Sequence, residues 1–165
     1  MNKPMSDEQV RARFDLTKPH HFLALGFGAG LMRPAPGTWG TLVAVPIFLL
    51  LSAMATPMVY IGVTLLISVV GIWICGRCAQ DIGVHDHGAI VWDEIAGFLV
   101  TMTLVEATWL NILLGFGLFR FFDIVKPWPI GYVDRKVQGG FGIMIDDIIA
   151  GLFSLIVLHL VLTLI

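Results

Sequence analysis

Long apolar stretches recur along this chain and limit the folds that it can adopt. Four of them approach the roughly 17–25 residues that a membrane-spanning helix needs. They are Pro57–Cys75, His87–Val105, Ala107–Ile124 and Asp146–Ile165. Of the 165 residues, 57% are hydrophobic and only 13% are charged, whereas a soluble chain of this length still exposes roughly a third of its surface to water. The sequence therefore predicts an all-α fold, a polytopic transmembrane helical bundle.

A shorter apolar stretch, Gly40–Met54, carries Pro46 and makes a further span if its helix begins near Thr38 as the N-cap. The glycine-broken run Phe22–Met32 is too short to cross a bilayer. We expect that run to be interfacial, re-entrant or packed beneath the bundle. The sequence thus predicts about five spans, with a charged tail over residues 1–21 and a transmembrane domain over residues 22–165.

Charged residues predict the orientation of this bundle. All ten Lys and Arg residues fall in, or within about a turn of, alternate connections between the predicted spans. The positive-inside rule places those connections and the N-terminus in the cytoplasm. Of the twelve Asp and Glu residues, only Glu106 falls on the outer side, so an acidic site is expected to face the cytoplasm. The net charge of −2 and the lack of a basic run argue against a nucleic-acid partner.

Acidic residues occur at three predicted spans. Asp93 and Glu94 are expected about two turns inside the third span, where an ionised carboxylate costs up to ~3 kcal/mol. Asp93 shares a helix face with Gly97 and Thr101, which is typical of a close helix contact. Further acids lie at the inner ends of the fourth and last spans, namely Asp123, Asp146 and Asp147.

Carboxylates that converge with open coordination positions are the usual ligands of Mg²⁺. One alternative is purely structural: Asp146 and Asp147 cap a helix, and Asp123 pairs with Arg120 or Lys126. Capping does not require two acids per helix, and adjacent acids repel unless they are protonated or metal-bound. The five acids together therefore favour a metal site.

Two other segments carry candidate residues. Arg33 and Thr38, in the turn before the first span, are suited to hold a phosphate, or belong to a rigid Pro/Gly turn with a snorkelling Arg. His85 and His87 are candidate acid–base groups or merely interfacial polar residues. Together with Cys75 and Cys78 they allow a zinc interpretation, although the spacing fits none of the usual structural zinc patterns and small buried thiols explain the cysteines better.

Several longer blocks of sequence, in the order of the chain, resemble those of a known family. They are Gly26–Gly30 with Pro36–Gly40, His85–Gly88 with Val91–Glu94, Phe119–Ile130, and Gly139–Asp147. On these blocks the chain resembles the phosphatidylglycerophosphatase A family, from about Phe22 to Gly151. The resemblance implies a Mg²⁺-dependent lipid phosphatase of the bacterial cell inner membrane, which converts phosphatidylglycerophosphate to phosphatidylglycerol in phospholipid biosynthesis.

The resemblance and the placement of the charges together give a hypothesis for the site. Its metal ligands are Asp93, Glu94, Asp123, Asp146 and Asp147. Its catalytic residues are Asp93, Asp123, Asp147, His85 and His87, with Asp86 as a further proton carrier. Its phosphate-binding residues are Arg33, Thr38, Arg120 and Lys126. Direct attack by water and a phospho-aspartyl intermediate both stay open.

A small ion or proton transporter is the alternative function, because it would also place carboxylates inside a bundle. Transporter sites usually lie near the midplane between repeats. The acids here are expected near one face, and no clear inverted repeat is visible. A scaffold subunit would not need paired buried acids, so the enzyme is favoured over both.

Overall fold

The computed structural model describes residues 5–164, which are helical with connecting loops and contain no strand. Its α-helices are α1 (Asp7–Arg11), α2 (Pro19–Ala24), α3 (Pro36–Met54), α4 (Pro57–Ile82), α5 (Trp92–Thr101), α6 (Trp109–Val125), α7 (Ile130–Lys136) and α8 (Gly139–Leu164), and the 3-10 helix η1 (Ala29–Leu31) follows α2. The predicted all-α class is confirmed. Residues 1–4 of the predicted tail and Ile165 of the last predicted span lie outside the described residues.

Three helices, α3, α4 and α8, are long and apolar enough to cross a membrane. The predicted third span is wrong in extent, because α5 has only ten residues and is roughly 15 Å long. The segment before Trp92 is held in a loop, where the Val91 N–H donates to the Ala24 carbonyl over 2.8 Å. With α6 at 17 residues, five complete crossings stay a prediction.

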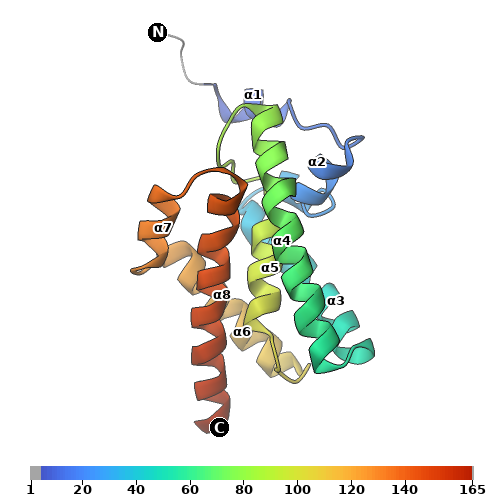
Figure 1. The fold of residues 1–165 in the computed structure, drawn as a ribbon, viewed down its shortest axis with the longest axis vertical. Coiled ribbons are helices and arrows are strands. Elements are labelled where there is room, and N and C mark those ends of the chain that lie inside the picture. The colour runs from blue at the N-terminus through green and yellow to red at the C-terminus, as the bar shows by residue number, and fades with distance from the viewer. Residues whose placement is uncertain (1–4, 165) are drawn as a thin grey trace.

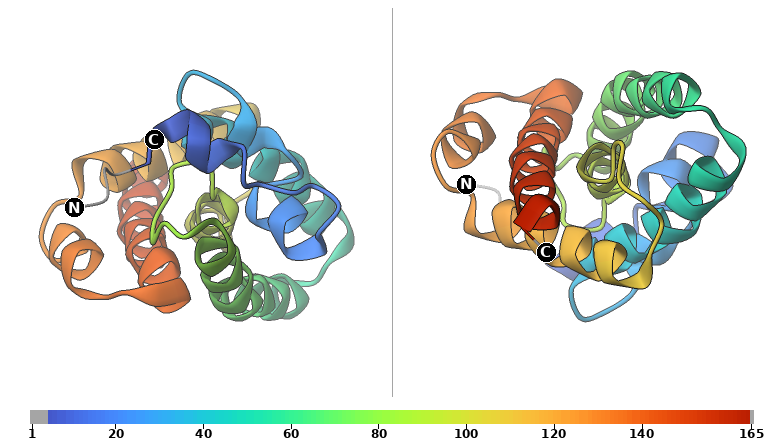
Figure 2. Two further views of the ribbon diagram at one scale, coloured as in Figure 1. Left: turned by 90° about the horizontal axis from the view of Figure 1, so that it is seen from above. Right: turned by 90° about the horizontal axis from the view of Figure 1, so that it is seen from below.

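Helix α5 lies at the centre of the bundle (Figure 2). It packs against α8, α3, α4 and α6, and α8 in turn packs against α4, α6 and α7. Eight of the ten residues of α5 are buried. A polar side chain on this helix is therefore enclosed by protein, which removes most of the cost of placing it in lipid.

Local signals in the sequence set several helix ends. The Thr56 side chain accepts from the Val59 N–H at the start of α4, and Gly83, at φ +74°, ends that helix. Helix α6 ends at Val125, after which Lys126 has a left-handed backbone and Pro127 follows.

The start of α3 corrects a prediction. This helix begins at Pro36 with Ala35 in the N-cap position, so Thr38 lies inside the first turn and is not the N-cap. Proline is favoured at the first helical position because its missing N–H is not needed there.

The segment Phe22–Met32 packs against one end of the bundle, which was one of its three predicted placements. Ala24 and Leu25 are fully buried there. Figure 1 shows α1 and α2 at this end and the C-terminal end of α8 at the opposite end. We call the end that carries α1 and α2 the head of the bundle, and the opposite end its base.

Candidate functional site

Acidic side chains from α5, α6 and α8 meet inside the bundle, toward its head. Asp93 and Glu94 lie in the first turn of α5, Asp123 lies in the last turn of α6, and Asp147 lies on α8. Carboxylate oxygens of Asp93, Glu94 and Asp147 all lie within 4.8 Å of one another. The structure thus brings together acids that the sequence predicted to converge.

Both adjacent acid pairs, Asp93–Glu94 and Asp146–Asp147, lie at other positions in their helices than the sequence predicted. Asp93 and Glu94 open α5, instead of lying two turns inside a span, because that helix begins only at Trp92. Asp146 and Asp147 lie in the interior of α8, which begins at Gly139. They therefore cannot cap this helix, and the capping interpretation of this pair is wrong.

Several oxygens of the cluster are buried and have no hydrogen-bond partner in the protein. They are Asp93 Oδ1, Glu94 Oε2, Asp146 Oδ1 and Asp147 Oδ2. An unpaired buried carboxylate oxygen is costly, and oxygens of this kind are the ligands that Mg²⁺ prefers. The cluster therefore has the donor set of a divalent metal site.

Two basic side chains border the acids. Arg120 Nη1 lies 2.6 Å from Asp123 Oδ2 and 3.8 Å from Glu94 Oε1, so it joins α6 to the first turn of α5. Lys126 Nζ lies 2.6 Å from both Asp134 Oδ1 and Asp146 Oδ2. Although burial lowers the pKa of Lys126, its hydrogen bonds to these two carboxylates raise it overall, so the ammonium stays charged.

The first turn of α3 lies directly against this site. A Cβ placed on Gly37 would lie 2.3 Å from Glu94 Oε1 and 2.9 Å from Arg120 Nη1. Only glycine allows so close an approach. Thr38 follows Gly37 in the same turn of α3, and its role in phosphate binding stays a prediction.

Comparison with known proteins identifies the family to which this chain belongs. The family model of phosphatidylglycerophosphatase A matches residues 22–162. The chain belongs to the phosphatidylglycerophosphatase A family. It is 44% identical over 154 residues to phosphatidylglycerophosphatase A of Haemophilus influenzae, covering 93% of this chain and 94% of that protein. It is 43% identical over 159 residues to phosphatidylglycerophosphatase A of Escherichia coli, covering 96% and 92%. No solved structure matches.

Family membership confirms the resemblance stated on the sequence blocks, and it does not favour the transporter alternative. The residue roles predicted from the sequence stay predictions. Of the phosphate-binding set, Arg120 and Lys126 lie at the acidic cluster of this phosphatidylglycerophosphatase A chain, whereas Arg33 is engaged elsewhere. Its Nη2 is hydrogen-bonded to Asp7 Oδ2.

The two candidate histidines lie in the loop between α4 and α5 and make different contacts. His85 Nε2 accepts a hydrogen bond from the backbone N–H of Gly139. His87 Nδ1 accepts from the Ala89 N–H, which leaves the proton of a neutral ring on Nε2, 3.0 Å from Asp7 Oδ1. Asp86 between them is exposed. The loop thus connects the head of the bundle to the first turn of α5.

The zinc interpretation has no support among the described residues. Cys75 and Cys78 are buried within α4, and Cys75 Sγ lies 3.8 Å from Met144 Sδ. Neither cysteine belongs to a group of side chains that converges on one point. They are small buried thiols, as the sequence favoured.

A second polar group, at the head, joins α2 to α4. His20 and His21 both place Nε2 near Asp81 Oδ2, at 3.0 and 3.3 Å. His21 Nδ1 accepts from the Asp15 N–H, so Nε2 of the neutral ring carries the proton and donates to Asp81. A protonated nitrogen cannot ligate a metal. The group therefore anchors the N-terminal segment rather than holding an ion.

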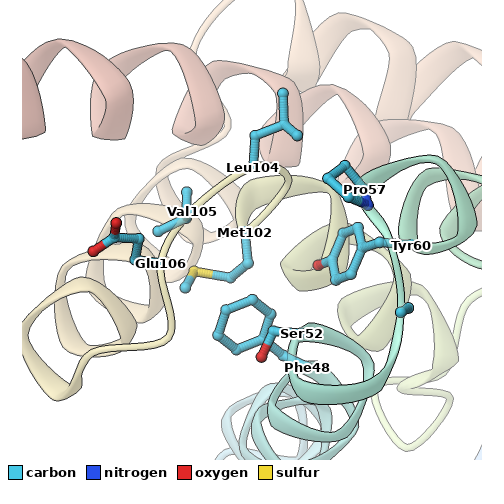
Figure 3. A pocket seen from close by; sticks show the side chains of 9 residues that line it. Phe48, Ser52, Pro57, Tyr60, Met102, Leu104, Val105 and Glu106 are labelled. Atoms are coloured by element: carbon cyan, nitrogen blue, oxygen red, sulfur yellow. The ribbon is translucent and has the colours of Figure 1, made fainter.

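A cavity of about 310 Å³ lies at the base of the bundle, and none of Asp93, Glu94 and Asp147 lines it. Figure 3 shows the side chains that surround it. Apolar side chains such as Phe48, Tyr60 and Met102 line it, together with Glu106. A carboxylate repels a phosphate, and none of the lining residues is basic. This cavity is not a phosphate site.

Sequence reasoning missed two acids that bind predicted site residues. Asp134 pairs with Lys126, and Asp7 pairs with Arg33 and His87. Asp134 lies on α7, which the sequence placed within a cytoplasmic connection. No local spacing connects Asp7 to residues so far along the chain, so only the fold could reveal this contact.

Proposed function

We propose that this chain hydrolyses the terminal phosphomonoester of phosphatidylglycerophosphate, which gives phosphatidylglycerol and inorganic phosphate. In the net reaction a water oxygen forms a bond to phosphorus, the bond between phosphorus and the glycerol oxygen breaks, and that oxygen gains a proton. The observation that carries the proposal is the buried cluster of Asp93, Glu94 and Asp147, with its unpaired oxygens, in a chain of this family.

Mg²⁺ is the cofactor that we propose for this cluster, held by Asp93, Glu94 and Asp147, with Asp146 and Asp123 beside them. When bound, the ion neutralises phosphoryl oxygens and activates water as a nucleophile. The donor set fits, since four carboxylate oxygens of these acids are buried without a hydrogen-bond partner. A hard cation that prefers oxygen ligands would satisfy them.

The basic side chains of the site are suited to bind the transferred phosphoryl group. Arg120 presents a planar guanidinium that can bind two phosphate oxygens at once, and Lys126 adds a point charge. Both are paired with acids of the same cluster, over 2.6 Å to Asp123 and Asp146. A phosphate between them would therefore be held by groups that the protein has already oriented.

In this proposal, the loop between α4 and α5 supplies the proton to the leaving glycerol oxygen. His85 is exposed at its surface, and its Nε2 is already oriented by the Gly139 N–H. An imidazole can both donate and accept a proton, which suits an acid–base group. His87 is held by Asp7 in this structure, so its participation requires that contact to break.

We propose that the bundle sits in the bacterial inner membrane with its head in the cytoplasm. Helices α3 and α4 meet at the base, where Ser52 and Pro57 line the same cavity as Met102 and Glu106. In this proposal the chain crosses the membrane five times, through α3, α4, α5 with the loop after it, α6 and α8, of which α3, α4 and α8 are long and apolar enough to span it. The acidic cluster then opens toward the cytoplasmic side, where the basic connections lie.

Phosphate release from phosphatidylglycerophosphate in detergent tests the proposal. We expect Mg²⁺-dependent release that EDTA abolishes and that Asp93→Asn reduces by about a hundredfold or more. Glu106→Gln at the base is the matched control and should keep wild-type activity, with folding of both variants checked by thermal unfolding. Full activity in EDTA, or in Asp93→Asn, would refute the assignment of the cluster.

A further inference from the structure

Helix α1 is fixed to the head of the bundle by the carboxylate of Asp7. Oδ2 contacts Arg33 Nη2 and lies 3.0 Å from Arg11 Nε, and Oδ1 lies 3.0 Å from His87 Nε2. Two guanidinium groups and one imidazole thus surround a single carboxylate. Arg33 and His87, the two of these groups that lie outside α1, could instead bind a phosphodiester, because it is a monoanion that offers two acceptor oxygens.

The residues that hold Asp7 lie next to both loops that lead into the acidic cluster. Arg33 precedes α3, whose Gly37 touches the Glu94 and Arg120 side chains. His87 precedes α5, which begins with Trp92, Asp93 and Glu94. An anion bound by Arg33 and His87 would therefore contact both segments that lead into the helices of the acidic cluster.

The packing under α1 is loose. A cavity of about 500 Å³ separates this helix from the loop that follows α4, and it is lined by Met5, Asp7, Val10, Gly83, Val84 and His87. Val10 is the one buried residue of the five in α1. With so little apolar contact, the position of α1 depends mainly on its polar contacts, namely those of Asp7 and the hydrogen bond from Arg11 Nη1 to the Leu31 carbonyl oxygen.

We propose that Arg33 and His87, which hold Asp7 from outside α1, form the subsite for the phosphodiester group of the lipid substrate, and that Asp7 occupies this subsite until the lipid displaces it. The inference rests on the proposed function, since phosphatidylglycerophosphate carries a phosphodiester beside its terminal monoester. Helix α1 is then a latch at the entrance, and binding of the substrate opens it.

Kinetics of charge-neutralised variants test the latch. Asp7→Asn removes the internal competitor, so KM for the lipid should fall about two- to fivefold, as expected when an exposed ion pair no longer blocks the competent state. Glu8→Gln, the exposed neighbour, is the control and should leave KM unchanged. Arg33→Gln should raise KM. An unchanged KM in Asp7→Asn, or in Arg33→Gln, would overturn the proposal.

Amide hydrogen exchange of residues 7–11 tests the same inference without any turnover. In Asp93→Asn protein, phosphatidylglycerol, which keeps the phosphodiester but lacks the monoester, should speed the exchange of α1, and diacylglycerol, which lacks phosphate, should not. Equal exchange with both lipids would refute the latch. Faster exchange with inorganic phosphate alone would reassign the subsite to free phosphate. Absent lipid hydrolysis by the wild-type protein would refute the proposed function but leave this measurement interpretable.

Discussion

Gly97 on α5 and Gly151 on α8 lie in direct backbone contact. A Cβ placed on Gly151 would lie 2.5 Å from the Gly97 carbonyl oxygen, and one placed on Gly97 would lie 2.8 Å from the Asp147 carbonyl oxygen. The Thr101 hydroxyl donates to the Gly97 carbonyl across 3.0 Å on the same face. This contact fixes the distance between the helices that carry Asp93 and Asp147, so the acid cluster depends on two glycines.

Enlarging this contact should separate the helices. We expect Gly151→Ala to destabilise the protein by about 1–3 kcal/mol, the usual cost of overpacking, and to lower phosphatase activity because Asp147 moves. Gly117→Ala in α6 is the control, since a Cβ there meets nothing within 4 Å. Thermal unfolding and phosphate release measure both effects. A Gly151→Ala protein with wild-type stability and activity would contradict the argument.

The buried acids should also determine how strongly Mg²⁺ stabilises the protein. Without metal, Asp147→Asn should raise the melting temperature, because it removes one of several mutually repelling carboxylates. Mg²⁺ should stabilise the wild-type protein, by about 2.7 kcal/mol at a hundred times its Kd, and should stabilise Asp147→Asn far less. Thermal unfolding with Mg²⁺ and with EDTA measures the difference. Equal Mg²⁺ stabilisation of both proteins would remove Asp147 from the ligand set.

His21 should make the stability of the head depend on pH. Burial is the first cause that lowers the pKa of His21 below its ordinary value of 6.5. The unfolded chain then binds a proton that the folded chain does not, so the free energy of unfolding is greatest above about pH 6.5 and falls as the pH drops.

His21→Gln tests this dependence, because a glutamine can still accept from Asp15 and donate to Asp81 but does not titrate. Between about pH 7.5 and about pH 5.5 the wild-type melting temperature should fall more steeply than that of His21→Gln. Parallel curves for the two proteins would show that another group causes the slope.

Sequence patterns predicted the all-α class, and three of the five acids that they predicted to converge, Asp93, Glu94 and Asp147, do lie together. Apolar stretches gave α3, α4 and α8, and the i, i+4, i+8 face of Asp93, Gly97 and Thr101 is the face that meets α8. Such patterns are local, and each follows from the period of one helix.

Those patterns could not predict contacts between segments that lie far apart in the chain. The apolar run from His87 to Val105 begins with a loop. The sequence did not reveal this loop, because its buried residues, such as Ala89 and Val91, are as apolar as the residues of a membrane-spanning helix. The spacing predicted that Asp123 pairs with Arg120 or Lys126, and Arg120 does pair with it. Lys126 instead bonds to Asp134 and Asp146, because its backbone turns left-handed after α6. Asp7 meets His87 across 80 positions of the chain, and no spacing rule predicts that.

Lys126 itself supports a last prediction. It is the only described cation within hydrogen-bonding distance of Asp146, and it also binds α7 through Asp134. Lys126→Met keeps the length of the side chain but leaves both carboxylates without their cation, so we expect a loss of about 3 kcal/mol or more in stability. We also expect kcat to fall, since one phosphate-binding charge is lost. Lys136→Met, exposed at the end of α7, is the control and should change neither quantity. A Lys126→Met protein with normal kcat but lowered stability would restrict Lys126 to a structural role.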